Sequence, residues 1–324
     1  MPTVLVTGAG GFVGRPLCAR LTKHGYYVKA AMRSVESGNT FEKQVVPFVG
    51  DIVDSQSAVW RHAFKGVDTV IHLAACVHQR GKAITNEAVR LVNTEATARL
   101  CRLAVDAGIR RFIFISTAKV NGEISARPFS EQDPANPQDL YAQSKWEAEK
   151  QIAGITAGSA CDFVILRPPL VYGPRVKANF LSLLKLVAAD LPLPLGKMHN
   201  RRSMIYVGNL VDAIIAVMEH PQASGQVFMV SDGHDLSVAQ FVAMMADTMG
   251  RKPRLFPFPI NWLHRFFRIM GRGAAIEKIS RPLTVDASKI RNTLGWRPPF
   301  PVHVGINDTV VWFYASAGQN TAAS

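Results

Sequence analysis

The sequence is poor in cysteine and has no cysteine arrangement that suits a metal. Four cysteines occur among 324 residues, none of them in a C-x-x-C pair or at the spacing of zinc ligands. No run of eighteen apolar residues is present, so no transmembrane helix is expected. The first residues lack the basic start and the cleavage site of a secretory signal. We therefore expect reduced thiols, no metal site and a cytoplasmic location.

Acidic residues are also scarce relative to basic ones. The chain has 37 Lys and Arg against 24 Asp and Glu, a formal net charge of +13. The basic residues are scattered and form no long block, which favours small anionic partners such as nucleotides and argues against nucleic acid. One segment, residues 256–272, combines aromatic and basic residues. Packing of its aromatic side chains against a core is the favoured interpretation, and peripheral contact with an anionic membrane is the alternative.

Short β-branched runs alternate with longer helical patterns over the first half of the chain. Strands are expected at 3–7, 27–32, 45–49, 68–73, 111–115 and 163–166, and helices at 12–24, 55–64, 83–107 and 140–152. Such alternation predicts an α/β fold with a doubly wound, parallel Rossmann sheet. Prolines become frequent after residue 167, which predicts a smaller C-terminal substrate-binding lobe.

These patterns give the expected domain boundaries. Residues 1–166, with a strand at 227–230 in a returning segment near 205–232, would form the dinucleotide-binding Rossmann domain. Residues 167–204 and 233–317 would form the substrate-binding lobe, and residues 318–324, which are small and polar, a flexible tail.

A glycine-rich segment joins the first strand to the first helix. Glycines recur at positions 8, 11 and 14, the spacing found in short-chain dehydrogenases. Glycines at such a junction allow a tight turn and close approach of the backbone to a pyrophosphate, and the helix N-terminus offers unpaired N–H groups. A glycine turn without a ligand is the alternative. The residues predicted to bind the dinucleotide phosphates are Gly8, Gly10, Gly11, Phe12, Val13 and Gly14.

The end of the second strand bears on the choice between NAD and NADP. NAD-binding chains tend to place an acid there to hold the ribose 2′-hydroxyl. This chain has Arg33 and Ser34 instead, and a guanidinium can bind a 2′-phosphate. NADP(H) is therefore favoured over NAD, with a solvated surface arginine as the alternative. Further cofactor contacts are expected after the third and fourth strands, from Asp51 and Ile52 and from Leu73, Ala74 and Ala75.

A tyrosine and a lysine share one face at the start of a later helix. Tyr141 and Lys145 are four residues apart, and Tyr141 lies 24 residues beyond Thr117, which follows the fifth strand. A nearby ammonium and an oxidised nicotinamide would lower the pKa of the phenol, so Tyr141 could act as acid or base. Lys145 would also hold the nicotinamide ribose, and the Thr117 hydroxyl would bond the reacting oxygen. An ordinary exposed helix start is the alternative.

Together these features resemble the extended short-chain dehydrogenase/reductase family, in particular its nucleotide-sugar epimerase/dehydratase branch. The resemblance covers nearly the whole chain and includes residues 72–75, 93–94, 116–122, 166–174, 202–207 and 286–296. It implies a catalytic triad of Thr117, Tyr141 and Lys145. It implies additional cofactor contacts from Asn93, Ser116, Pro168 and Leu170. It implies a UDP-sugar substrate held by Thr117, Lys119, Asn121, Asn179, Phe180, Leu195 and Arg202. We also expect a homodimer.

Two departures from the family pattern guide the functional prediction. Ala118 and Lys119 replace the acid pair of the 4,6-dehydratases, and Asn121 replaces a tyrosine usual in epimerases. The sequence looks most like bacterial reductases of UDP-4-keto-6-deoxy-N-acetylhexosamines. We therefore expect NADPH-dependent reduction of the C4 keto group of a UDP-linked deoxy sugar, for surface polysaccharide or lipopolysaccharide precursors. The alternatives are a UDP-hexose 4-epimerase with tightly bound NAD, a reductase of a sterol-like or flavonoid-like ketone, and a non-catalytic NADP-binding protein.

Overall fold

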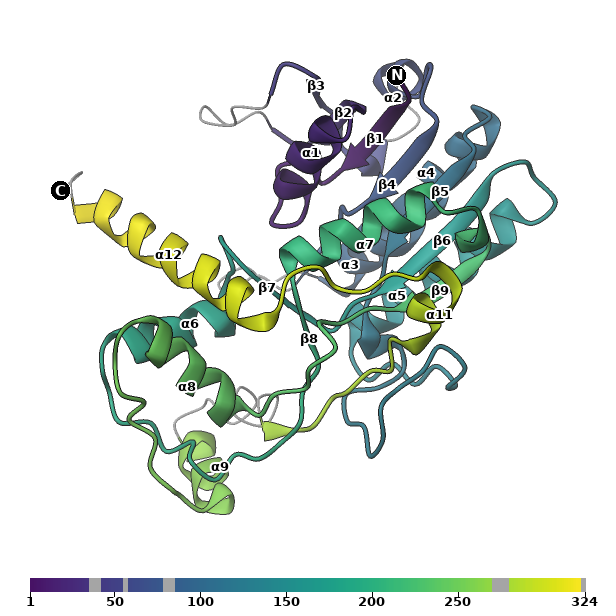
Figure 1. Cartoon of the computed structure of the whole chain (residues 1–324). Coiled ribbons are helices and arrows are strands. Elements are labelled where there is room, and N and C mark those ends of the chain that lie inside the picture. Colours follow the sequence, from purple (N-terminus) through teal and green to yellow (C-terminus); the bar gives the residue numbers. More distant parts are fainter. Residues whose placement is uncertain (35–41, 55–57, 78–84, 270–279, 322–324) are drawn as a thin grey trace.

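A parallel seven-stranded sheet forms the centre of the larger part of the molecule (Figure 1). The computed structural model describes residues 1–34, 42–54, 58–77, 85–269 and 280–321. The strand order is β3-β2-β1-β4-β5-β6-β9, with every neighbouring pair parallel. The strands are β1 (Thr3–Thr7), β2 (Tyr27–Met32), β3 (Val45–Val49), β4 (Thr69–His72), β5 (Arg111–Ile115), β6 (Asp162–Arg167) and β9 (Gln226–Met229).

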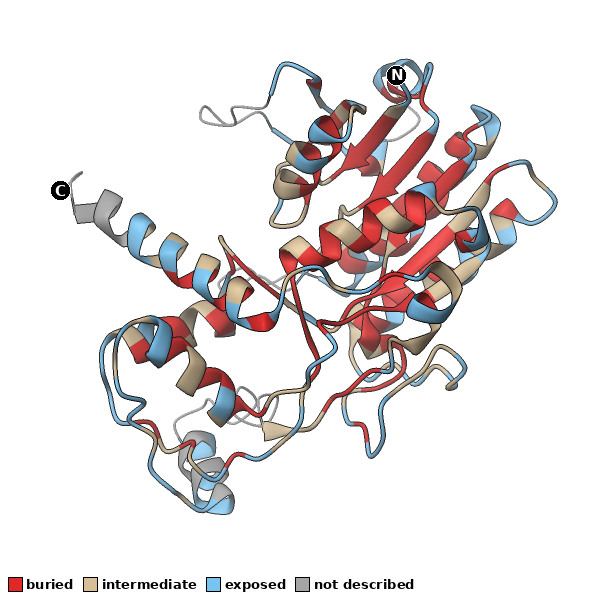
Figure 2. Cartoon of the chain, viewed as in Figure 1, coloured by how far each residue is buried: buried red, intermediate tan, exposed pale blue. Residues whose placement is uncertain are grey.

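Helices cover both faces of this sheet. On one face lie α1 (Gly14–Lys23), α7 (Val207–Glu219) and α11 (Ser288–Leu294), and on the other α2 (Ala58–Ala63), α4 (Thr97–Asp106) and α5 (Leu140–Thr156). In β1, Val4 and Val6 enter the first core and Leu5 the second, because successive side chains of a strand point to opposite faces. The central strands β1, β4 and β5 are accordingly buried along nearly their whole length, whereas the edge strand β3 is largely exposed (Figure 2).

Short helices occupy several of the connections. They are η1 (Ile52–Asp54), α3 (Asn86–Arg90), the π-helical η2 (Leu91–Ala96), η3 (Ala118–Val120) and η4 (Pro221–Ala223). A fully buried arginine, Arg111, fastens the start of β5 to its surroundings. Its guanidinium binds both carboxylate oxygens of Asp162 at 2.8 Å and the carbonyl oxygen of Val217 at 2.7 Å. This contact joins β5, β6 and the end of α7.

The smaller lobe has an apolar core of its own. It contains the two-stranded parallel pair β7 (Leu170–Tyr172) and β8 (Met204–Tyr206), with α6 (Ala178–Ala188), α8 (Val238–Thr248), α9 (Ile260–Ile269) and α12 (Val302–Thr321). Tyr172 stacks on Phe180 at 5.8 Å between ring centroids and meets Phe241 edge-on at 5.5 Å. Buried Asp232, after β9, accepts hydrogen bonds from the Tyr172 hydroxyl and the Tyr206 amide, and so fastens this core to the sheet.

The predicted doubly wound sheet is confirmed, including a returning strand near residue 227. Two helices begin later than predicted, and α5 continues to Thr156 instead of ending at residue 152. The first helix begins at Gly14, not residue 12, because the Gly11 amide bonds back to the Gly8 carbonyl and prolongs the loop. The helix expected at 83–107 begins at Asn86, capped by Thr85, and passes through the π-helical η2. Residues 55–57 and 83–84 of the expected helices lie outside the described residues.

Two assignments of the C-terminal half need correction. Residues 288–296 pack on the Rossmann part instead of the smaller lobe: Ile290 and Trp296 belong to the core beneath α7, and the Trp296 indole donates to Asp212 at 2.8 Å. The expected flexible tail is helical as far as Thr321, because α12 continues to that residue. Residues 322–324 lie outside the described part.

The cysteines are free thiols, as predicted. Burial raises the pKa of Cys18 and of Cys101 to about 12, which makes these thiols unreactive at neutral pH. Within the described residues, no group of three or more His, Cys, Asp and Glu side chains is arranged to hold a metal ion. The described part of the chain also has no helix with both the length and the apolar character needed to cross a membrane.

Candidate active site

The glycine-rich loop has a geometry that side chains would block. Gly8 has φ +67°, and a Cβ there would lie 2.9 Å from the Ala74 amide nitrogen. A Cβ on Gly14 would lie 2.3 Å from the Gly8 carbonyl oxygen, so the first turn of α1 can pack on the loop only without one. No side chain caps the N-terminus of α1, and its first turn has no acid. Its N–H groups therefore suit an anion such as a pyrophosphate.

A buried histidine joins the carboxyl ends of β1 and β4, where the strand order reverses. His72 bonds Thr7 Oγ1 through Nδ1 at 2.6 Å and Thr97 Oγ1 through Nε2 at 2.9 Å. Burial, reinforced by the charge of Lys145, lowers the pKa of His72 to about 3, so the imidazole is neutral. Ligands of doubly wound sheets bind at such a reversal point. This contact fixes the backbone of residues 73–75, which are predicted to pass under the cofactor.

The residues expected near the adenosine differ in exposure. Arg33 and Ser34 are exposed directly after β2, and β2 reaches the glycine loop through the hydrogen bond from the Ala9 amide to the Ala31 carbonyl. Asp51 is also exposed, and its carboxylate accepts the Val53 amide at 2.9 Å. The Ile52 side chain, in contrast, is buried in the core beside α2, so we no longer assign it to the adenine.

The structure brings Tyr141 and Lys145 to the carboxyl end of β5, the strand that Thr117 follows. Lys145 Nζ donates to the Ile115 carbonyl at 2.8 Å. This bond ties α5 to the last residue of β5, two residues before Thr117. Lys145 Nζ lies 5.9 Å from the centre of the Tyr141 ring. Thr117 is extended and is the N-cap of η3, while Asp139 caps α5 by accepting the Ala142 amide at 2.8 Å. Lys145 thus lies near both Tyr141 and the end of β5, and Thr117 follows that strand end by two residues.

The protein's own groups keep the phenol protonated. Burial, followed by the charge of Asp139, raises the pKa of Tyr141 to about 12, whereas the lowering expected from the sequence depends on an oxidised nicotinamide. Burial also lowers the pKa of Lys145 to about 7, with the carboxylate of Glu149 opposing the shift. The lysine is thus a weak source of positive charge, and the phenol is protonated at neutral pH. A protonated phenol is suited to donate a proton to a ketone oxygen.

A buried ion pair lies next to these residues and was not predicted from the sequence. Arg167 Nη2 and Glu149 Oε2 are 2.5 Å apart, and both side chains are almost fully buried. Ser116 Oγ donates to the same carboxylate. The signal that could have revealed Glu149 is its spacing: Tyr141, Lys145 and Glu149 follow one another at four-residue intervals along one face of α5.

This ion pair also accounts for two predicted ligand contacts that the structure does not support. The Asn121 carboxamide is buried; its oxygen accepts from Arg167 Nη1 at 3.0 Å and its nitrogen donates to the Asp133 carbonyl at 2.9 Å. Asn121 is thus a support for Arg167 and not a substrate contact. Ser116 is likewise buried with its hydroxyl on Glu149, so we do not assign it to the cofactor.

Asn93 has a similar supporting geometry. It is buried in the π-helical segment, where its carboxamide oxygen accepts the Cys76 amide at 2.7 Å and its nitrogen donates to Ser144 Oγ at 3.0 Å. These bonds join the loop after β4 to the helix of Tyr141. A π-helical turn at this place is typical of a functional site. Asn93 therefore positions the site and is not placed to bind the cofactor itself.

The predicted cofactor contacts after β6 lie beside the threonine. The Pro168 carbonyl accepts the Ala118 amide at 2.9 Å, which places Pro168 next to η3. Leu170, at the start of β7, is 47% exposed. Both positions agree with the expectation that these residues flank the nicotinamide, which stays a prediction.

Two charged side chains expected to bind substrate take part in one polar cluster. Lys119 Nζ binds Asp139 at 2.6 Å and Glu123 at 2.8 Å. Although burial works against it, these hydrogen bonds raise the pKa of Lys119 overall. Arg202 is close enough to Glu123 for their charges to interact, and its Nη1 donates to the Arg281 carbonyl at 2.6 Å. Arg202 stays a candidate for binding the substrate diphosphate. Lys119 could bind substrate only after breaking its ion pairs with Asp139 and Glu123.

The apolar side chains expected at the substrate have another role. Phe180 and Leu195 are both buried in the core of the smaller lobe, where Phe180 packs between Tyr172 and Phe241. We therefore withdraw their assignment to the nucleotide. The side chain of Asn179 lies outside what the structure describes.

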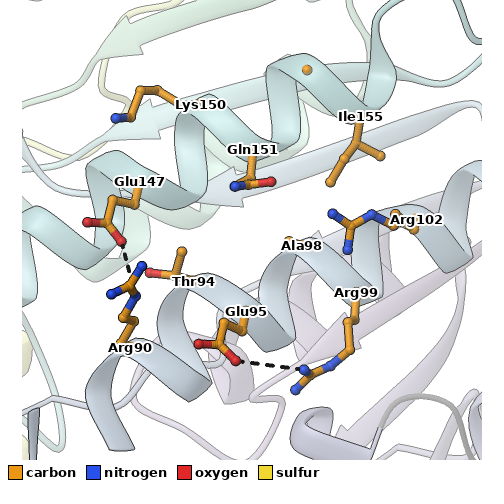
Figure 3. A pocket seen from close by; sticks show the side chains of 11 residues that line it. Arg90, Thr94, Glu95, Ala98, Arg99, Arg102, Glu147, Lys150, Gln151 and Ile155 are labelled. Carbon is orange, nitrogen blue, oxygen red and sulfur yellow. Dashed lines mark ion pairs between the residues drawn. The ribbon is translucent and has the colours of Figure 1, made fainter. Parts of the chain in front are cut away.

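A separate open hollow of about 810 Å³ lies between α4 and α5 (Figure 3). Its side chains form the ion pairs Arg90–Glu147 at 3.8 Å and Arg99–Glu95 at 4.0 Å. Glu147 and Gln151 point to the opposite side of α5 from Tyr141 and Lys145, because the helix turns 3.6 residues per revolution. This hollow is thus separate from the candidate active site.

Known sequences match this chain along almost its whole length. Residues 4–231 match the model of the NAD dependent epimerase/dehydratase family. A UDP-glucose 4-epimerase of Vibrio cholerae is 40% identical over 323 residues, which cover 96% of this chain and 95% of that protein.

Solved structures share the fold over the same length. The structure of MoeE5 in complex with UDP-glucuronic acid and NAD aligns with a TM-score of 0.79 and 25% identity, over 97% of this chain and 99% of that one. A UDP-glucose 4-epimerase of Thermotoga maritima with UDP-glucose has a TM-score of 0.79 at 22% identity, over 97% and 99% of the two chains. The second likeness concerns the fold alone.

Proposed function

Because the chain belongs to the NAD dependent epimerase/dehydratase family, we propose that it is a UDP-hexose 4-epimerase that keeps NAD bound. The observation that carries this proposal is the 40% identity to a UDP-glucose 4-epimerase across nearly the full length of both chains. Thr117, Tyr141 and Lys145 would supply the groups that the reaction needs, and the position of Lys145 beside Tyr141 and the end of β5 supports this assignment. This reverses the order of the two leading interpretations of the sequence, which put a 4-ketoreductase first.

The residues at the carboxyl ends of β1 and β4 fit a dinucleotide. Gly8 and Gly14 leave no room for a Cβ where the loop meets α1, and the uncapped N-terminus of α1 suits the pyrophosphate. The structure of MoeE5, at 25% identity, holds NAD together with a UDP-sugar. When bound, NAD would accept a hydride from C4 of the sugar and return it.

The proton chemistry is assigned to this chain's own side chains. The Tyr141 phenolate would take the proton of the C4 hydroxyl, and the phenol so formed would later give it back to the C4 oxygen, while the Thr117 hydroxyl holds that oxygen. With a pKa of about 12, Tyr141 is well suited to the proton-donating half of the cycle. The proton-accepting half requires the phenolate, which the Lys145 ammonium and a positively charged nicotinamide would favour. Arg202 would bind the substrate diphosphate.

A second candidate function is supported by Arg33. An arginine in the exposed position after β2, in place of an acid, suits the 2′-phosphate of NADP(H). A cofactor drawn from the NADPH pool suits net reduction of a UDP-4-keto-6-deoxy sugar. The protonated state of Tyr141 fits this direction as well. In that reaction the same Tyr141 and Thr117 would act once, on one face of C4.

One experiment separates the two candidates. The purified protein is denatured and any released dinucleotide identified; intact protein is then incubated with UDP-galactose and, separately, with NADPH and a UDP-4-keto-6-deoxy sugar. We expect bound NAD and interconversion of UDP-galactose with UDP-glucose. Stoichiometric oxidation of NADPH by the keto sugar, without epimerisation, would establish the reductase instead.

The assembly and location expected from the sequence stay part of this proposal. We expect a homodimer, which light scattering of the purified protein would reveal, and a cytoplasmic enzyme, which cell fractionation would test. A role in surface polysaccharide synthesis would follow from the sugar that the assay identifies.

A further inference from the structure

The segment after α8 carries basic and aromatic side chains without any acid. Residues 251–272 contain six Lys and Arg and five Phe and Trp, and no Asp or Glu. Among the described residues of this segment, several with exposed side chains form what we call the α9 surface: Lys252, Arg254, Trp262, Arg265, Arg268 and Ile269. Helix α9 lies beyond α8, at the end of the smaller lobe that is farthest from the sheet (Figure 1).

The exposed side of α9 presents large apolar side chains to solvent. Trp262 is 65% exposed and Ile269 is 80% exposed, and their seven-residue separation places them on the same side of the helix, two turns apart. Arg265 and Arg268, also exposed, follow Trp262 by three and six residues and so lie on the adjoining strip of the helix. The favoured expectation, that the aromatics of this segment pack against the core, does not hold for Trp262. The pattern is that of a helix lying in a membrane interface.

A basic hollow lies just before α9 in the sequence. It measures about 480 Å³ and is lined by Asp190, Arg251, Lys252 and Arg254. The one carboxylate, on Asp190, binds Arg254 Nη1 at 3.2 Å. Three cations against one carboxylate leave the hollow positively charged, which suits phosphate groups.

The hollow and α9 belong to one structural unit. The Leu193 amide donates to the Arg254 carbonyl at 2.8 Å, and the Phe256 amide donates to the Leu193 carbonyl at 3.1 Å. This backbone pairing anchors the chain between the hollow and the start of α9 at residue 260. Phe256 and the nearby Leu191 are also exposed, at 40% and 48%. The approach to α9 therefore carries both basic and exposed apolar side chains.

We propose that the α9 surface binds the anionic face of a phospholipid bilayer. Trp262 and Ile269 would enter the boundary between headgroups and acyl chains, where tryptophan is enriched in membrane proteins. Arg265, Arg268 and the cations of the hollow would bind lipid phosphates. Charge complementarity favours this occupant over a protein, because a stretch without acids meets a uniformly negative surface. The surface lies away from Tyr141 and Lys145, so this proposal is independent of the sugar chemistry.

The test is flotation of the purified protein with vesicles of phosphatidylcholine, either alone or with phosphatidylglycerol. We expect binding to the vesicles that contain phosphatidylglycerol, release by high salt, and a blue shift of tryptophan emission that Trp262→Phe diminishes. Removing two charges by Arg265→Gln with Arg268→Gln should weaken vesicle binding roughly tenfold or more. Activity on a soluble UDP-sugar should be unchanged in these variants, which shows that they fold.

The matched control removes two exposed charges at the other end of the molecule, by Lys23→Gln with Arg61→Gln on α1 and α2. It should bind vesicles as the wild type does. Equal weakening in the control would mean that net charge and not the α9 surface is responsible, and would overturn the proposal. Failure of the wild type to bind either vesicle would also overturn it, as would association of two copies that Trp262→Ser abolishes without any vesicle binding.

Discussion

Arg167 and Glu149 form a buried ion pair behind the three side chains proposed to be catalytic. Arg167 Nη2 lies 2.5 Å from Glu149 Oε2, and the two side chains are 5% and 2% exposed. Glu149 follows Lys145 by one turn of α5, and its charge counteracts the effect of burial on the pKa of that lysine. The pair thus connects the end of β6 to the protonation of Lys145. We regard Glu149 as a positioning residue, because it acts through Lys145.

Glu149→Gln should shift the pH profile of the enzyme. Burial holds the pKa of Lys145 near 7, and the Glu149 carboxylate is the group that raises it. Without that charge the pKa of Lys145 falls further, so the ammonium is lost at lower pH. If the ammonium supports catalysis, the decline of kcat with rising pH should begin at lower pH in the variant. Removing one partner of a buried pair should also cost roughly 3–5 kcal/mol of stability.

The control for this variant is Glu147→Gln. Glu147 is on the same helix but only half-buried, and its carboxylate pairs only loosely with Arg90 at 3.8 Å. Both the pH profile and the stability should stay near those of the wild type. A Glu149→Gln enzyme with reduced stability and an unmoved pH profile would show that Glu149 supports the fold alone.

Tyr141→Phe should abolish most of the activity while leaving the dinucleotide site intact. The substitution removes the hydroxyl that carries the proton and keeps the ring. Loss of a general acid or base should lower kcat roughly 10²–10⁴-fold. Rates are measured with saturating substrate, and dinucleotide binding by fluorescence titration serves as the control. Near-normal kcat in the variant would remove Tyr141 from the mechanism.

Arg33→Ala tests the second candidate function, in which the enzyme uses NADP(H). The Arg33 side chain is exposed after β2, where the ribose of a dinucleotide on the glycine loop would lie. Loss of a charged contact to a 2′-phosphate should weaken NADP binding roughly tenfold or more and leave NAD binding nearly unchanged. Calorimetric titration of both dinucleotides measures this, with Lys23→Ala on α1 as a control. Equal affinities of the wild type for the two dinucleotides would contradict the assignment.

His72 should make the folded protein sensitive to acid. The pKa of the buried imidazole is about 3, against an ordinary value of 6.5, so between these values the unfolded chain takes up a proton that the folded chain does not. The contribution is therefore complete above pH 6.5 and is lost as the pH falls towards 3. Its slope is at most about 1.4 kcal/mol per pH unit.

The variant His72→Gln tests this sensitivity. Its carboxamide cannot titrate in this range, so its stability should depend less on pH, although it is less stable at neutral pH. Urea unfolding at a series of pH values measures the difference, and His62→Gln, at an exposed histidine of α2, should keep the wild-type slope. Identical slopes in the wild type and His72→Gln would contradict the prediction.

Features that depend on residues close together in the sequence were predicted well. The strands and the glycine loop could be located because β-branched runs and glycine spacing are local signals, and the spacing of Tyr141 and Lys145 places both on one helix face by geometry alone. The triad could be proposed because Thr117 follows the end of a predicted strand of the same sheet.

Contacts between residues that are far apart in the sequence could not be predicted from such local signals. Arg167 reaches Glu149 and Asn121, which lie 18 and 46 residues away, and a sequence pattern does not show which side chains meet in the fold. Asn121 was therefore mistaken for a substrate contact. Phe180 was misassigned for a similar reason, since an aromatic residue near a site and one in a core look alike until packing distinguishes them. The raised pKa of Tyr141 also depends on burial, which local spacing does not reveal.

The order in which the strands occur has a consequence for biosynthesis. β6 is completed at Arg167, but its outer neighbour β9 begins only at Gln226, and Ile290 and Trp296 are needed to complete the core beneath α7. A nascent chain that ends between these points exposes a bare strand edge and an open apolar face, both of which promote aggregation. The first part of the chain therefore stays prone to aggregation until roughly the last hundred residues have left the ribosome and completed the sheet and the core. Chains interrupted there would depend on chaperones even though the dinucleotide motif is already complete.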